Sequence, residues 1–321
     1  MAKTIVRRFL ILIPQLFVLS LALFLLADAM PGDAIFGLAG NYASPAEIEA
    51  LRAVHGFGGS WYSQYITWIG NVFRGDFGRS LVHNTTVTNL IGNRVFNTLW
   101  LSLVSTIFTL AISFPLGILA ARYARKWQDQ AILTYCFVTQ AIPTIALAIL
   151  SIWIFALQLR WFPRGGSVDV LIPPSDTTAI LLSRIHHLIL PSLVLAVLGN
   201  LSTIFILRAQ IIDNASSAYV TTAKSKGVPG RVIYNKHILR NSLLPFAQSI
   251  PFLVIGLLSG SVFVERLFSF PGMGDLLVGA LQARDFTVVN ALIMMYGILT
   301  IVGILAGDIL LSLLDPRIKV K

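Results

Sequence analysis

Long runs of apolar residues, separated by short polar segments, dominate this chain of 321 residues. A helix needs about twenty apolar residues to cross a hydrocarbon core of about 30 Å. The chain offers six candidate runs, at residues 9–26, 99–121, 131–159, 188–207, 243–264 and 288–314. Because the runs lack the two-residue alternation of a barrel strand, and backbone groups in lipid must be paired, helices are the only option. The pattern predicts an all-α polytopic membrane protein with six transmembrane helices.

The first run resembles a signal peptide, since basic residues precede it and Ala27-Asp28-Ala29 follows it. A signal peptide usually has an apolar region of about 7–15 residues. The stretch from Phe9 to Leu26 is longer, with eighteen residues. We therefore expect residues 1–30 to be retained as the first transmembrane helix.

Residues 31–96 are predicted to form an extracytoplasmic segment with short amphipathic helices. Ser44-Pro45-Ala46-Glu47 is a capping box that starts one such helix. A second helix carries one apolar face, made by Trp61, Tyr65, Trp68, Ile69 and Val72. This face suits a membrane interface, but it suits packing against the protein's own helices equally well. Both interpretations remain open.

The composition agrees with a membrane protein, because 12% of the residues are charged, against about a quarter in soluble proteins. The net charge of +10 has a topological explanation. Six spans place both termini, the 122–129 loop and the 208–242 loop on one side. This side carries fifteen of the 24 Lys and Arg residues, including all seven lysines, so the positive-inside rule makes it cytoplasmic. The charge therefore requires no nucleic acid.

Sequence signatures of catalysis and nucleotide binding are absent from the chain. It contains no P-loop, no nucleophile elbow and no HExxH motif. Cys136 is the single cysteine, which excludes an internal disulfide and a thiolate cluster. His186 and His187 are adjacent and point in different directions on a helix, so we expect no shared metal site. The chain is predicted to be non-catalytic, with no bound metal or cofactor.

The cytoplasmic loop at residues 209–244 carries the strongest functional signal. It is basic, with no acidic residue between Tyr219 and Pro245. A helical stretch leads to Gly227, and a short turn separates it from a second helical stretch. Ala223 and Gly227 lie four residues apart, and small residues on one face permit close approach of another surface. We expect the helix at 216–227 to transmit force from a cytoplasmic partner.

This loop resembles the EAA loop of bacterial ABC importer permeases. The similar stretch is Thr221-Thr222-Ala223-Lys224-Ser225-Lys226-Gly227, with Thr221 at the family's glutamate position. His237-Ile238-Leu239-Arg240-Asn241-Ser242-Leu243 is similar to a motif of the peptide and nickel branch. Further similar stretches are 74–80, 265–274, 283–285 and 314–317. Their order identifies the chain as a member of this branch, of the first-permease type.

The resemblance implies a type I importer fold, with a five-helix core at 97–321 after the first helix and the outer segment. It implies a heterodimer with a paralogous permease, two cytoplasmic ATPase subunits that hold ATP and Mg²⁺, and an extracytoplasmic peptide-binding protein. The chain would form half of the translocation pathway, surrounded by the lipid of a bacterial inner or plasma membrane, with both termini cytoplasmic.

The resemblance also assigns roles to individual residues. The ATPase-coupling residues would be Tyr219, Thr222, Ala223, Ser225, Lys226 and Gly227. Support for the loop would come from His237, Arg240 and Asn241. The motif of the outer loop is formed by Glu265, Pro271, Gly272, Met273 and Gly274.

Peptide import is the leading interpretation, and nickel or glutathione import by the same machinery differs only in substrate. An ion-coupled secondary transporter is the alternative from a different class. It predicts buried charge in several spans, whereas Asp308 is the one acidic residue inside a span and lies near its cytoplasmic end. Proline and glycine in the spans, such as Pro143 and Pro191, could mark broken helices around a site. We favour close helix packing instead, because the breaks do not recur in two halves.

The topology predicts the outcome of labelling lysines from outside. Because all seven lysines are placed in the cytoplasm, a membrane-impermeant amine reagent added to intact cells is expected to modify none of them. Mass spectrometry of the purified chain measures the modification, and permeabilised cells provide the positive control. Labelling of Lys226 in intact cells would overturn the topology.

Overall fold

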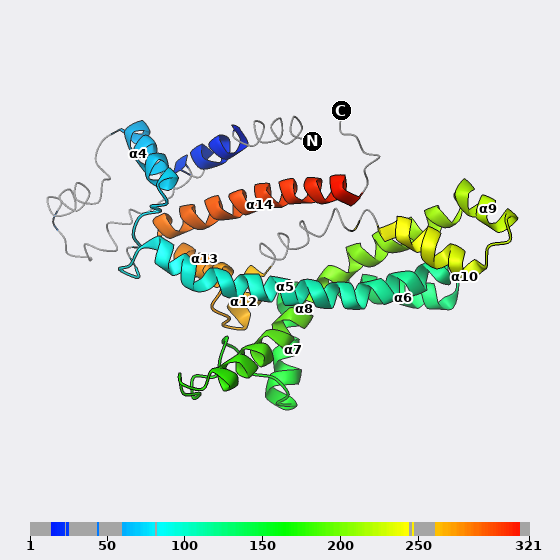
Figure 1. Ribbon diagram of the computed structural model, residues 1–321. Helices are drawn as coiled ribbons and strands as arrows, with labels where there is room; N and C mark the ends of the chain where they lie inside the picture. Colours follow the sequence, from blue (N-terminus) through cyan, green and yellow to red (C-terminus); the bar gives the residue numbers. More distant parts are fainter. Residues whose placement is uncertain are drawn as a thin grey trace. The chain divides into compact units, whose positions relative to one another are not determined.

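The computed structural model describes residues 14–22, 24–25, 44, 60–80, 82–243, 246 and 261–314, and its regular elements are helices (Figure 1). By contact, the chain divides into two compact units. The first comprises residues 1–98 with 271–302, and the second comprises 99–270 with 303–321. The helices of the first unit include α4 (Trp61–Phe73) and α13 (Met273–Gln282), together with the first part of α5 (Val87–Arg122) and most of α14 (Phe286–Leu314).

The second unit contains the rest of α5 and the other helices of the described chain. These are α6 (Trp127–Ala141), α7 (Thr144–Ser151), η1 (Ile152–Gln158), α8 (Thr177–Ala215), α9 (Ala218–Ser225), α10 (Gly230–Val232), η2 (Ile233–Leu239) and α12 (Val262–Leu267).

Among the described residues, three helices are long and apolar enough to cross a membrane, namely α5, α8 and residues Phe286–Gly307 of α14. The pair α6 and α7–η1 provides a fourth span if the bent pair is counted as one. Three of the predicted runs are thereby confirmed, and the run at 131–159 is a fourth span only if the bent pair crosses the membrane as one. The run at 243–264 lies largely outside the described residues, and the run at 9–26 is described only at residues 14–22 and 24–25. The capping box after Ser44 and the side chain of Asp308 also lie outside the described residues.

The long helices extend past the bilayer. At about 1.5 Å per residue, the 39 residues of α8 make a helix nearly twice as long as a hydrocarbon core of about 30 Å. Asp176 begins this helix because its carboxylate accepts a hydrogen bond from the backbone N–H of Ala179 at 2.9 Å. The connection between η1 and α8 therefore ends at Asp176.

The interpretation of the span prolines as packing residues is wrong at Pro143. The helix breaks between α6 and α7, and the two pieces are bent by 97°. Proline removes a backbone donor, and it also disfavours helical geometry in the residue before it. Ile142 accordingly has an extended backbone, with φ −82° and ψ 122°. Pro115 and Pro191, in contrast, lie inside continuous helices.

A buried ion pair joins α6 to α8. The guanidinium of Arg208 donates to both carboxylate oxygens of Asp129, at 2.7 and 2.6 Å. Asp129 also accepts from the backbone N–H of Arg125 at 2.7 Å, and its side chain is 2% exposed. The same helices share a small apolar cluster of Ala120, Ile132, Cys136 and Ile204. The pair therefore fixes the turn between α5 and α6 onto α8.

Loss of this ion pair is expected to loosen the helix bundle. Removing one partner of a buried pair costs about 3–5 kcal/mol, because the other charge is left uncompensated. We expect Asp129→Ala to lower the unfolding temperature clearly, whereas Asp213→Ala, at an exposed acidic residue of α8, should leave it unchanged. Cys136 is fully buried, so a thiol-reactive dye that fluoresces on reaction reports unfolding directly. Equal unfolding temperatures for the two variants would contradict the role of the pair.

Candidate functional site

The basic loop folds as a helix, a turn and a second helix, as the sequence predicts. The first helix is α9 (Ala218–Ser225), and the second is α10 followed by η2, which ends at Leu239. The turn between them ends at Pro229, the residue before α10, whose ring fixes its own backbone angle φ. Figure 1 shows α9 and α10 close to the end of α8, and η2 contacts both α9 and α8.

An apolar cluster fastens this loop to the transmembrane helices. Val220 on α9 is 1% exposed and packs with Ile233 and Ile238 of η2. The cluster continues into Leu207 and Ile211 of α8, which are also buried. Burial of a Val, Leu or Ile side chain contributes about 1.5–3 kcal/mol. Helix α9, the predicted coupling helix, is therefore held against the end of α8.

Gly227 ends α9 in a left-handed conformation, with φ +73°. Its N–H donates to the Lys224 carbonyl at 3.0 Å, and the N–H of Val228 donates to the Ala223 carbonyl at 3.2 Å. This pair of bonds is a Schellman motif, which favours glycine at this position. Ala223 is half-buried and packs on the apolar cluster of the loop. Ala223 therefore fits α9 to its own support and Gly227 serves the turn, while the coupling role of these two residues stays a prediction.

A buried hydroxyl links the coupling helix to both of its supports. The phenol of Tyr219 donates to Asn214 at 2.8 Å, and the amide of Asn214 donates to Ser242 at 3.1 Å. Ser242 is fully buried, and its Oγ lies 3.0 Å from the Gln210 carbonyl and 2.8 Å from the Ile238 carbonyl. The sequence did not indicate Asn214 as a site residue, because its partner Ser242 lies 28 residues along the chain.

The outward face of the loop is polar and positively charged. The exposed residues include Thr222, Ser225 and Lys226 of the predicted coupling set, and Tyr219 is 37% exposed. The predicted support residues His237, Arg240 and Asn241 are also exposed, so the packing support comes from Ile233 and Ile238 instead. The exposed cations are Lys224, Lys226, Arg231, Lys236 and Arg240. This surface can accept an acidic partner.

Tyr234 lies on the inner side of η2 and packs on the apolar cluster of the loop. Its hydroxyl is buried without a hydrogen-bond partner among the described residues. Burial raises the pKa of this phenol, although the nearby charge of Arg122 opposes the effect. The residue is therefore neutral and contributes to packing rather than to acid–base chemistry.

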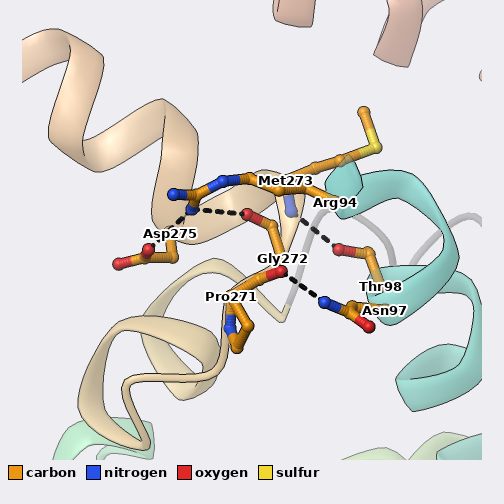
Figure 2. A network of polar contacts seen from close by, with 7 residues as sticks. All are labelled: Arg94, Asn97, Thr98, Pro271, Gly272, Met273 and Asp275. Carbon is orange, nitrogen blue, oxygen red and sulfur yellow. Dashed lines mark hydrogen bonds and ion pairs between the residues drawn. The ribbon is translucent and has the colours of Figure 1, made fainter. Parts of the chain in front are cut away.

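The outer-loop motif is fastened to the first part of α5 (Figure 2). The backbone N–H of Met273 donates to Thr98 Oγ1 at 2.8 Å, and the amide of Asn97 donates to the Pro271 carbonyl at 2.8 Å. Arg94 forms an ion pair with Asp275 at 2.9 Å and also reaches the Gly272 carbonyl at 3.5 Å. Met273 and Gly274 are buried at the start of α13. These contacts position α13 beside α5.

Two other motif stretches meet in the same unit. Ser80, at the end of the 74–80 stretch, donates from its Oγ to Asp285 at 2.5 Å. The carboxylate of Asp285 also accepts from the backbone N–H of Val288 at 3.4 Å, in the first turn of α14. Gly78 has φ +86°, and a Cβ there would lie 2.9 Å from the Thr287 side chain. The glycine therefore permits this close approach.

Glu265 belongs to the second unit and is fully buried in α12. Its carboxylate accepts a hydrogen bond from Ser261 Oγ at 2.9 Å, and its carbonyl accepts one from the Phe270 N–H at 2.8 Å. The residue thus organises the turn that follows α12. The outer motif is accordingly shared between the two units.

Comparison with known proteins accounts for almost the whole chain. Residues 113–320 match the family described as "Binding-protein-dependent transport system inner membrane component". Residues 1–103 match the family described as "Binding-prot-dependent transport system membrane comp, N-term". The two matches leave only residues 104–112 and Lys321 uncovered.

Individual relatives are similar over their full length. The oligopeptide transport system permease protein AppB of Bacillus subtilis (strain 168) is 37% identical over 99% of this chain and 100% of its own. The glutathione transport system permease protein GsiC of Escherichia coli (strain K12) is 32% identical over 100% of both chains. A solved inward-facing structure of the MetNI methionine ABC transporter shares the fold, with a TM-score of 0.55 and 16% identity over 70% of this chain and 96% of that one.

The buried hydroxyl of Ser242 provides a test of how α9 is held. Ser242→Ala removes one of the two acceptors of the Asn214 amide, which also donates to the Gln210 carbonyl at 2.8 Å. Loss of an intramolecular hydrogen bond costs about 0.5–1.5 kcal/mol. We expect the backbone amides of α9 to exchange with deuterium about tenfold faster in this variant, which corresponds to about 1.4 kcal/mol. Ser216→Ala is the control, because Ser216 is exposed and its Oγ contacts only the nearby Asp213 carbonyl. Unchanged exchange in Ser242→Ala would rule out the proposed link.

Proposed function

Because the chain belongs to the family of inner-membrane components of binding-protein-dependent transport systems, we propose that it couples peptide import to a partner ATPase through α9. The chain is a permease of an ABC importer and a non-catalytic membrane component. It lies in the inner membrane as a multi-pass, all-helical protein. The coupling loop carries the proposal, because it combines an exposed basic face with a buried attachment to α8.

In the proposed assembly the chain crosses the membrane six times, and both of its termini are cytoplasmic. It pairs with a paralogous permease, so that each chain forms half of the pathway. Two ATPase subunits on the cytoplasmic side bind ATP and Mg²⁺, and a peptide-binding protein delivers substrate from outside. The 1–30 helix, the 31–96 outer segment and the 97–321 core are the proposed parts of the chain. The two family matches, which divide near residue 103, support this organisation.

The proposed substrate is a short peptide. Similarity over the full length to an oligopeptide permease supports it. The second relative is named for glutathione, which is itself a tripeptide. Both names thus point to peptide chemistry, whereas the nickel alternative from the sequence gains no support from them.

The proposed mechanism uses α9 as a rigid connection. Closure of the ATPase subunits on ATP moves the groove in which α9 sits. Because Val220 is buried against η2 and α8, displacement of α9 is transmitted to the end of α8. The energy of ATP binding thereby biases the equilibrium between inward-open and outward-open states. The exposed Lys224 and Lys226 provide the charge for an acidic groove on the ATPase.

Substitutions at Gly227 distinguish its role in the turn from a role in the docking surface. A Cβ at this position would meet nothing within 4 Å, but φ is +73°. Gly227→Ala therefore adds only backbone strain, of about 1–2 kcal/mol, while Gly227→Trp adds the same strain and a large side chain. We expect the Trp variant to hydrolyse ATP while losing most peptide uptake in proteoliposomes, and the Ala variant to retain most uptake.

Gly227→Asn is the matched control, because asparagine tolerates the left-handed conformation. It is expected to behave like the native chain in both assays. Normal uptake by the Trp variant would exclude a docked partner at this end of α9. Equal losses in the Ala and Trp variants would mean that Gly227 serves the turn alone.

A further inference from the structure

Helix α4 (Trp61–Phe73) has three distinct sides, although the sequence analysis recognised only one apolar face. One side is directed inward, where Tyr65 is 7% exposed. A second side carries Tyr62, Ile66 and Phe73, which share a face because they are separated by four and seven residues. The third side is polar and carries Ser63, Thr67 and Asn71, again four residues apart.

The inward side of α4 packs against the first apolar run. The ring of Tyr65 lies edge-on to Phe24 and Phe17, with centroids 5.5 and 6.2 Å apart. The Tyr65 hydroxyl lies 2.8 Å from Ser20 Oγ, and Ser20 is 1% exposed. Both phenylalanines and Ser20 belong to the run at 9–26, so α4 lies beside a stretch that the bilayer surrounds. It does not stand away from the membrane in water.

The second side of α4 is apolar and exposed among the described residues. Tyr62 is 58% exposed, Ile66 64% and Phe73 86%. None of the thirteen residues of α4 is charged, and charge returns immediately afterwards at Arg74. At about 1.5 Å per residue, the helix is about 20 Å long and too short to cross the hydrocarbon core. A short helix with an apolar side and a polar side lies in the interface plane of a bilayer.

We propose that α4 is an interfacial helix, whose Tyr62–Ile66–Phe73 face is embedded among phospholipid acyl chains next to the first span. The first run also carries exposed apolar side chains, since Phe17 and Val18 are 54% and 63% exposed. The polar side, with Ser63 and Thr67 exposed, faces the headgroups and water. This inference rests on the first run crossing the membrane, and it holds whichever side of the membrane α4 occupies.

The test places a fluorescent label on the apolar side of α4 in one variant and on its polar side in another. In a Cys136→Ser background, Ile66→Cys and Thr67→Cys are labelled with an environment-sensitive maleimide, in the full-length chain and in the assembly in which it purifies. The protein is reconstituted in phosphatidylethanolamine and phosphatidylglycerol vesicles that contain a phosphatidylcholine with a nitroxide high on its acyl chain. We expect the lipid nitroxide to quench the label at position 66 more than at 67. Iodide added to the water should quench in the opposite order.

Two results would overturn the proposal. Stronger quenching by iodide at position 66 than at 67 would place the apolar face in water. Protection of position 66 from both quenchers would mean that a protein surface, such as a second permease, covers it. Peptide uptake by the labelled assembly is measured separately, so a failure of the interfacial helix is distinguishable from a failure of the proposed function.

Discussion

Burial of Val220, Ile233 and Ile238 against Leu207 and Ile211 is the interaction on which the coupling mechanism depends. An isolated helix of eight residues, such as α9, is not stable in water. Its stability must come from packing, and the packing partner is the end of a helix long enough to cross the membrane. The same contacts that stabilise α9 therefore also connect it mechanically to α8. The basic face remains open because the apolar residues are directed inward.

The family motifs of the outer loops serve a different purpose. Ser80 and Asp285 lie 205 residues apart in the chain, yet they form one hydrogen bond. Arg94 and Asp275 are likewise distant in sequence, and their contact fixes the start of α13. These residues satisfy backbone groups and one another at the ends of helices. Their described contacts give them a structural role, while the proposed coupling role is assigned to exposed residues of the 209–244 loop.

Local patterns in the sequence predicted much of the fold. The apolar runs correctly located three spans among the described residues, and a fourth if the bent pair of α6 and α7–η1 counts as one. The glycine and proline near 227–230 correctly marked the turn between α9 and α10. Side-chain direction was harder to predict. Ala223 was assigned to an external partner because it is small, but it packs on the cluster of its own loop. A periodicity argument identifies a face, and only the tertiary structure shows what that face contacts.

Long-range polar pairs and the shape of the broken helix could not be predicted. Asp129 and Arg208 form their ion pair across 79 residues, and a single sequence contains no signal that pairs them. Pro143 indicated a weak point in a helix, but proline in membrane helices is compatible with a straight helix or a kink. The bend of 97° depends on how α7 packs against α8 and α12. Ser242 belongs to the 237–243 motif, and the resemblance does not indicate that its hydroxyl joins α8 to η2.

In the proposed mechanism, α9 and the end of α8 move as one rigid body. Spin labels at Thr222 and Asp213, which are exposed on these two helices, allow the distance between them to be measured by pulsed electron paramagnetic resonance in a Cys136→Ser background. The assembly is compared without nucleotide and with ATP trapped on its ATPase subunits. A rigid connection between α9 and α8 predicts the same distance distribution in both states. A shift of the distribution on ATP binding would show that α9 moves independently of α8, and it would contradict the proposed coupling.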